Sequence, residues 1–295
     1  MFLIIKDVDF ASYADDNTPY VTEESVEQVK SRLENTVSSL FQWFKDNEMR
    51  ANANKCHFLV SSKETAVIEA QGNHIENSQF EKLLGITFDT NLTFNLHLNQ
   101  MCKTASQKLN AIARVIPQMC LHKRKTVIKS FFMSLFNYCP LVWMCHNRSY
   151  NNRINQLHER SLRMVYNDKW SSFEDLLRKD GSVSIHVKNI QVLMTEMYKV
   201  KNNLAPILLS EVFKLKPTST YNLRTVGEFE IRRVRTTNFG TESLSFLGPK
   251  LWNTVPLSIR NVETLKEFKS KIRYWIPESC PCRLCRNYVQ NLGYI

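Results

Sequence analysis

The stretch DFASYADDNTPY, residues 9–20, places two carboxylates side by side, Asp15 and Asp16. The residues on either side are typical of short strands, so the pattern predicts a hairpin with the aspartates at its tip. Adjacent like charges repel each other, so the pair is either an ordinary acidic turn or part of a metal site. Magnesium prefers oxygen ligands and often takes only one or two protein carboxylates, so both interpretations are open at this point.

The residues that follow predict the rest of a small α+β region. Apolar side chains recur every three or four positions through residues 23–47, which indicates an amphipathic helix with Thr22 as its N-cap. Three short β-leaning runs come next, CHFLVS (56–61), TAVIEA (65–70) and KLLGITFD (82–89), and they predict three strands of a small antiparallel sheet.

From about residue 96 the apolar period changes to that of helices. We expect helices at about 96–116, 122–139, 151–165 and 171–181, the last with a capping box from Ser171 to Glu174. A further long helix carries Ile190, Leu193, Met197 and Val200 on one face. Beyond residue 206, EFEIRRVRTT (228–237) is strand-like and VETLKEFKSKIRYW (262–275) is helical. The fold class expected is α+β, in three segments: 1–95, a helical segment 96–205, and a basic C-terminal segment 206–295 with a cysteine-rich tail.

Charge points to a polyanionic partner. Lys and Arg number 39 against 28 Asp and Glu, a formal net charge of +11, and nucleic acid is the commonest partner of such proteins. The start MFLIIKDVD has too few consecutive apolar residues for the apolar region of a signal peptide. No run in the sequence reaches the ~20 apolar residues of a membrane-spanning helix. We therefore expect an intracellular protein of the cytoplasm or nucleus, not secreted and without a membrane partner. Motifs for nucleophilic hydrolysis or dinucleotide binding are missing from the sequence.

The hairpin and its surroundings resemble the reverse transcriptases of non-LTR (LINE-type, jockey-like) retrotransposons. The matching motifs are SYADDNTPY (12–20), LFQWFKDNEMRANANKCHFLV (40–60), FEKLLGITFD (80–89) and the ending CPCRLCRNYVQNLGYI (280–295). The resemblance implies a partial polymerase palm, with the YADD hairpin, a helix and a small antiparallel sheet, followed by a helical thumb-like region. It also implies RNA-directed DNA polymerase ancestry, with an RNA template, a DNA primer, deoxynucleoside triphosphates and catalytic magnesium, and no small-molecule cofactor.

Residue by residue, the resemblance implies a catalytic set of Asp15, Asp16 and Lys55. Asp15 would bind magnesium, Asp16 would be a supporting carboxylate, and Lys55 would lie near the incoming triphosphate, where a cation offsets developing charge. The residues expected to lie against the primer are Tyr13, Leu84 and Gly85.

One part of the family pattern is missing. Polymerases of this family take another metal-binding aspartate from an earlier palm strand, whereas only twelve residues precede Tyr13 here. Asp7 and Asp9 lie on the strand that enters the hairpin and cannot also supply a neighbouring strand. We therefore expect a fragment of a reverse transcriptase, from a truncated element or an incomplete gene model, that does not polymerise DNA by itself. The alternatives are a non-catalytic nucleic-acid-binding module and a pseudogene product.

Two basic runs are candidates for contact with phosphates, HKRKTVIK (122–129) and RRVR (232–235). Either run is also typical of a solvated surface, and a steep salt dependence of nucleic-acid binding would separate the two interpretations. The candidate residues are Lys123, Arg124, Lys125, Arg232, Arg233 and Arg235.

The tail motif CPCRLC contains three closely spaced cysteines, Cys280, Cys282 and Cys285. Thiolates are good zinc ligands, but zinc takes four ligands and no fourth is evident nearby. A remote histidine such as His186 would complete the site only if folding brings it there. The alternative is a tail of unligated thiols.

Overall fold

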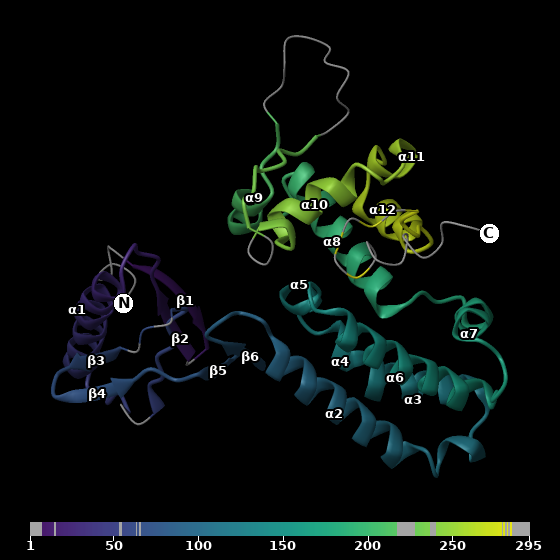
Figure 1. Cartoon of the computed structure of the whole chain (residues 1–295), viewed down its shortest axis with the longest axis horizontal. Helices are drawn as coiled ribbons and strands as arrows, with labels where there is room; N and C mark the ends of the chain where they lie inside the picture. The colour runs from purple at the N-terminus through teal and green to yellow at the C-terminus, as the bar shows by residue number, and fades with distance from the viewer. Residues whose placement is uncertain are drawn as a thin grey trace, which may run out of the picture. The chain divides into compact units, whose positions relative to one another are not determined.

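A computed structural model describes residues 8–14, 16–52, 55–62, 64, 66–216, 228–236, 240–278, 280, 282 and 284. The chain divides into two compact units, Met1–His97 and Leu98–Ile295, and each is described by itself (Figure 1). Helices and small antiparallel sheets make up the described residues, which agrees with the predicted α+β class. The three predicted segments, 1–95, 96–205 and 206–295, stay predictions.

The first unit contains one long helix and three separate two-stranded antiparallel sheets. In chain order its elements are β1 Asp9–Tyr13, β2 Asp16–Tyr20, α1 Val26–Asp46, β3 Val67–Ala70, β4 Asn73–Glu76, β5 Phe80–Leu83 and β6 Ile86–Asp89. The sheets pair β1 with β2, β3 with β4, and β5 with β6.

The amphipathic helix predicted over residues 23–47 is confirmed as α1. It begins three residues later than expected, because the side chain of Ser25, not Thr22, accepts a hydrogen bond from the backbone N–H of Gln28 (3.3 Å). Leu33 and Leu40 are buried on its apolar face, as the spacing predicts. This face packs against β3 and the small core of the unit.

The predicted three-stranded arrangement is wrong in two places. CHFLVS forms only one isolated bridge, between Phe58 and Asn77, because the Asn77 side chain takes the backbone N–H of Val60 (3.0 Å) that a neighbouring strand would have taken. KLLGITFD is a hairpin and not one strand, because Leu84 and Gly85 both have positive φ (47° and 84°) and turn the chain between β5 and β6. Two residues with positive φ are typical of a type I′ turn.

The second unit is helical among its described residues. Its elements are α2 Asn95–Ile112, which begins at the end of the first unit, a 3₁₀ turn Ile116–Gln118, α3 Leu121–Ile128, a π-helical turn Lys129–Met133, α4 Ser134–Asn137, α5 Pro140–Trp143, α6 Arg148–Tyr166, α7 Phe173–Asp180, α8 Ile185–Lys201, α9 Ile207–Val212, α10 Leu244–Trp252, α11 Leu257–Arg260 and α12 Leu265–Ile272. No helix of the described residues is long and apolar enough to cross a membrane.

Helix α8 is the centre of the second unit. It contacts α5, α6, α9, α10 and α12, and most of its side chains are buried, including Ile190, Leu193 and Met197 (Figure 1). Ser184 caps its first turn by accepting a hydrogen bond from the backbone N–H of Val187 (3.3 Å). The helix therefore offers a rigid support to the segments packed along it.

Two local predictions for the second unit need correction. Helix α7 ends at Gly181 as predicted, but its capping pair is Ser172 and Asp175. The hydroxyl of Ser172 donates to the carboxylate of Asp175 (2.7 Å) and accepts from the backbone N–H of the same residue (3.1 Å). The strand predicted at 228–237 is absent from its described residues 228–236, where Phe229 makes only an isolated bridge with Leu215. The side chain of Phe229 packs into the helical core instead.

Candidate functional site

The hairpin β1–β2 is confirmed, and its tip carries two of the predicted residues. Tyr13 pairs with Asp16, and both side chains are exposed, Tyr13 by 67%. Ala14 lies in the connecting turn with a φ of 53°, a left-handed conformation that is uncommon for a residue with a side chain. Asp15, the predicted principal magnesium ligand, lies outside the described residues. The described part of the tip thus presents an aromatic ring and one carboxylate to solvent.

Among the described residues, Asp16 belongs to no group of three or more side chains whose ligand atoms lie close enough to share an ion. Asp9 pairs with Tyr20 at the opposite end of the hairpin, four residues from Tyr13, which corresponds to about 13 Å along a strand. Asp9 therefore cannot share an ion with Asp16, as expected from the sequence, and Asp7 lies outside the described residues. The described side chains do not by themselves fit a magnesium site.

The other residues predicted for the polymerase site lie in turns of the same unit. Lys55 is exposed in a short helical turn, where its backbone N–H donates to the carbonyl of Asn52 (2.9 Å). Leu84 and Gly85 form the tip of the β5–β6 hairpin, and Leu84 is 42% exposed. Their proposed roles at the triphosphate and the primer stay predictions.

The basic run 122–129 divides into side chains that face solvent and side chains used within the fold. The guanidinium of Arg124 donates to the backbone carbonyls of Met119 (2.8 Å), Pro117 (3.1 Å) and Val165 (3.4 Å). Lys123, by contrast, is exposed, and its side chain has no hydrogen bond or ion pair with another described residue. Of these two residues, Lys123 is the one whose side chain is exposed to solvent, and its contact with a phosphate stays a prediction.

Lys125 is also engaged within the fold. Its ammonium forms an ion pair with Asp180 (3.1 Å) and lies 5.1 Å from the ring centre of Tyr166. A hydrogen bond with Tyr166, followed by the interactions with Asp180, raises the pKa of Lys125, so this side chain stays charged. Lys125 therefore links α3 to α6 and α7.

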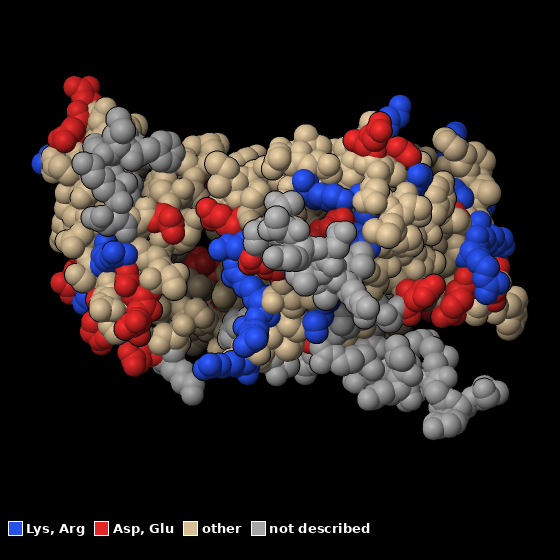
Figure 2. All heavy atoms as spheres, turned by 90° about the horizontal axis from the view of Figure 1, so that it is seen from above, with Lys and Arg blue, Asp and Glu red and all other residues tan. Residues whose placement is uncertain are grey.

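The second basic run is more open. Arg232, Arg233 and Arg235 are all exposed, and Arg232 donates to the backbone carbonyl of Glu211 (3.1 Å). Arg233 and Arg235 have no ion pair or hydrogen bond within the described part of the chain. On the face that Figure 2 shows, Lys and Arg side chains gather in separate groups with Asp and Glu between them.

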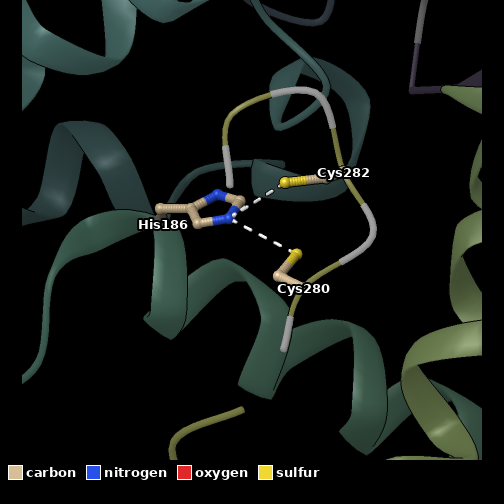
Figure 3. Close-up of side chains that lie close together, drawn as sticks. All are labelled: His186, Cys280 and Cys282. Carbon is tan, nitrogen blue, oxygen red and sulfur yellow. Dashed lines mark hydrogen bonds between the residues drawn. The ribbon is translucent and has the colours of Figure 1, made fainter. Parts of the chain in front are cut away.

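The structure also brings together side chains that are distant in the sequence. His186, in the first turn of α8, lies beside Cys280 and Cys282 of the tail, with its Nε2 atom 3.8 and 3.4 Å from their sulfur atoms (Figure 3). All three residues are buried. Cys285, the third cysteine of the predicted zinc motif, lies outside the described residues.

Comparison with known proteins gives a relationship of modest strength. The chain is 26% identical over 171 residues to the "RNA-directed DNA polymerase from mobile element jockey" of Drosophila melanogaster, a match that covers 56% of this chain and 19% of that protein. It is 26% identical over 163 residues, 52% of the chain and 18% of the relative, to the "Probable RNA-directed DNA polymerase from transposon BS" of the same fly. A jockey polymerase of Drosophila funebris is 21% identical over 166 residues, 54% of the chain and 18% of the relative.

The curated homologues are RNA-directed DNA polymerases of non-LTR retrotransposons. This finding confirms the resemblance predicted from the hairpin motif, over about half of the chain. The chain spans about a fifth of the length of these polymerases. No protein-family model and no solved structure matches it. The roles of single residues in a polymerase site therefore stay predictions.

Proposed function

We propose that this chain is a nucleic-acid-binding part of a reverse transcriptase from a non-LTR retrotransposon. We further propose that the chain by itself does not extend a primer. The observation that carries the proposal is the β1–β2 hairpin, which exposes Tyr13 and Asp16 of the YADD motif in a chain whose homologues are RNA-directed DNA polymerases. The ligand is an RNA template paired with a DNA primer, and deoxynucleoside triphosphates would bind only to a complete site.

Charge supports the binding part of this proposal. The net charge of +11 favours a polyanion, and Lys123, Arg233 and Arg235 are exposed cations without a partner among the described residues. Each cation that neutralises a phosphate releases a counterion, so binding of this kind weakens steeply as salt is added. The same charges are available whether or not a polymerase site is complete.

Geometry supports the absence of primer extension. Two catalytic metal ions lie about 4 Å apart, and carboxylates from more than one strand are needed to hold them. The described part of the hairpin offers Asp16, which follows Asp15 in the sequence, while Asp9 lies at the other end of β1. Magnesium at such a tip would be held weakly and without a second ion, so the hairpin residues would contribute to nucleic-acid positioning and not to catalysis.

The first experiment measures binding. Fluorescence anisotropy with a labelled RNA–DNA primer–template should show binding that falls steeply between low and physiological salt. A double variant, Asp15→Asn with Asp16→Asn, should bind at least as tightly as the parent, with Asp9→Asn as the matched control. Absence of binding at low salt would refute the proposed function.

The second experiment measures extension of the same primer with magnesium and deoxynucleoside triphosphates. We expect no product above that of the double variant. Robust extension by the parent chain and not by the double variant would show that a complete metal site exists, and would contradict the proposed inactivity while supporting the polymerase ancestry.

A further inference from the structure

We propose that His186, Cys280 and Cys282 form a zinc site that fastens the C-terminal tail to helix α8. Among the described residues, these three form the single group of His, Cys, Asp or Glu side chains whose ligand atoms all lie close enough to share an ion, within 4.8 Å of one another. Figure 3 shows both sulfur atoms directed at the imidazole ring from residues two positions apart in the tail.

The separations of the ligand atoms match tetrahedral coordination. With Zn–S bonds of about 2.3 Å and Zn–N bonds of about 2.0–2.1 Å, a tetrahedral ion places a nitrogen and a sulfur ligand about 3.6 Å apart. The two separations observed, from His186 Nε2 to the sulfur atoms of Cys280 and Cys282, are 3.8 and 3.4 Å. Two of the three ligand separations therefore already match those around a tetrahedral zinc ion, and the two sulfur atoms lie within 4.8 Å of each other.

The chemistry of the donors selects the metal. Two thiolates and an imidazole are the ligands of structural zinc, whereas magnesium and calcium require oxygen ligands. Only 6–7% of the surface of each of the three residues is exposed, so water has little access to the cluster.

The path of the chain explains what the site would hold. The side-chain amide of Gln191 donates to the backbone carbonyls of Arg273 (3.1 Å) and Trp275 (2.9 Å), just after α12. His186 is five residues nearer the start of α8, about 7.5 Å along the helix, and it meets the tail at Cys280 and Cys282. The segment after α12 therefore runs along α8 toward its N-terminus, and the cluster is its second point of attachment.

The metal site would stabilise the folded state because its ligands are far apart in the sequence. His186 and Cys280 are 94 positions apart, so a metal bound to both closes a long loop. A link of this kind restricts the unfolded chain and stabilises the folded state, and structural zinc couples directly to folding. Zinc in closed structural sites takes four ligands, so these residues supply three of them, and Cys285 lies outside the described residues.

The test is the metal content of the purified full chain. Protein refolded with zinc chloride and then desalted should contain about one zinc ion per chain by mass spectrometry. His186→Gln, Cys280→Ser and Cys282→Ser should each weaken zinc binding at least 100-fold. Cobalt in place of zinc should give the visible absorption of a tetrahedral thiolate site, and that absorption should be lost in the same variants.

Matched controls separate a lost ligand from a damaged fold. His158 and Cys102 are a buried histidine and a buried cysteine of the same unit away from the cluster, so His158→Gln and Cys102→Ser should keep the zinc even if they lower stability. A chelator should lower the melting temperature of the parent and leave that of Cys282→Ser unchanged. Parent protein without zinc, or zinc kept by all three ligand variants, would overturn the assignment.

Discussion

Neighbouring residues of the basic run 122–129 should respond in opposite ways to replacement by alanine. The guanidinium of Arg124 donates to three backbone carbonyls at 2.8, 3.1 and 3.4 Å, and a hydrogen bond from a charged donor contributes about 1.5–3 kcal/mol. The longest of these bonds adds little, and the side chain is half-buried, so water replaces part of the loss. Arg124→Ala should therefore lower the free energy of unfolding by about 2–3 kcal/mol, whereas Lys123→Ala should change it by less than about 0.5 kcal/mol.

Nucleic-acid binding should show the reverse order. Lys123 faces solvent, so its loss removes one phosphate contact and makes the slope of log K against log salt less steep by about 0.7–0.9. Urea denaturation followed by far-UV circular dichroism measures the first effect, and anisotropy titrations at several salt concentrations measure the second. The reasoning is refuted if Arg124→Ala is as stable as the parent and also reduces the salt slope, because the guanidinium would then face the phosphates and not the carbonyls.

Three further substitutions test other contacts. Glu228 accepts a hydrogen bond from the indole of the buried Trp252 (2.7 Å). In urea denaturation, Glu228→Ala should therefore lower the free energy of unfolding by about 2 kcal/mol, and Glu228→Gln, which keeps an acceptor, by less than about 1 kcal/mol. Equal losses in the two variants would contradict this reasoning. Burial lowers the pKa of His158 from 6.5 to about 4, so the unfolded chain binds this proton more readily and stability is lost as the pH falls from 6.5 toward 4. Between pH 7 and 5 the loss is about 2 kcal/mol, and His158→Gln should be less pH-dependent by that amount, while an unchanged pH profile would show that His158 is not held neutral. Leu84 has a φ of 47°, and Asn-Gly is the preferred sequence of a type I′ turn, so Leu84→Asn should raise the free energy of unfolding of the first unit by about 1 kcal/mol. A lower melting temperature would show that the Leu84 side chain stabilises the unit by more than the turn conformation costs.

Local periodicity predicted what depends on near neighbours. The helix around Leu33 and Leu40 followed from apolar spacing alone, because one face of a helix can be read directly from the sequence. The hairpin at Tyr13 and Asp16 followed in the same way from two short strands and a turn. Errors arose where a single side chain changes the local hydrogen bonding, as at Asn77, which takes the backbone N–H of the expected strand.

Long-range contacts were harder to predict. The role of Arg124 within the fold depends on Val165, 41 residues away, and no local pattern distinguishes it from the exposed Lys123. The three-cysteine motif indicated zinc, but the choice of His186 among seven histidines required the packing of the tail along α8. Nothing local in the sequence connects His186 to Cys280, 94 positions away.

The separate two-stranded sheets of the first unit affect how precisely the side chains at the hairpin tip are held in position. A two-stranded hairpin is marginally stable without a third strand or a packed face, and β1–β2 pairs only within itself among the described residues. Catalysis requires reacting groups to be held within about half an ångström of their working positions, which depends on rigid surroundings. Apart from the contacts of β2 with α1, the hairpin has no neighbouring strand among the described residues, so an additional strand would add order to the exposed tip that carries Tyr13 and Asp16.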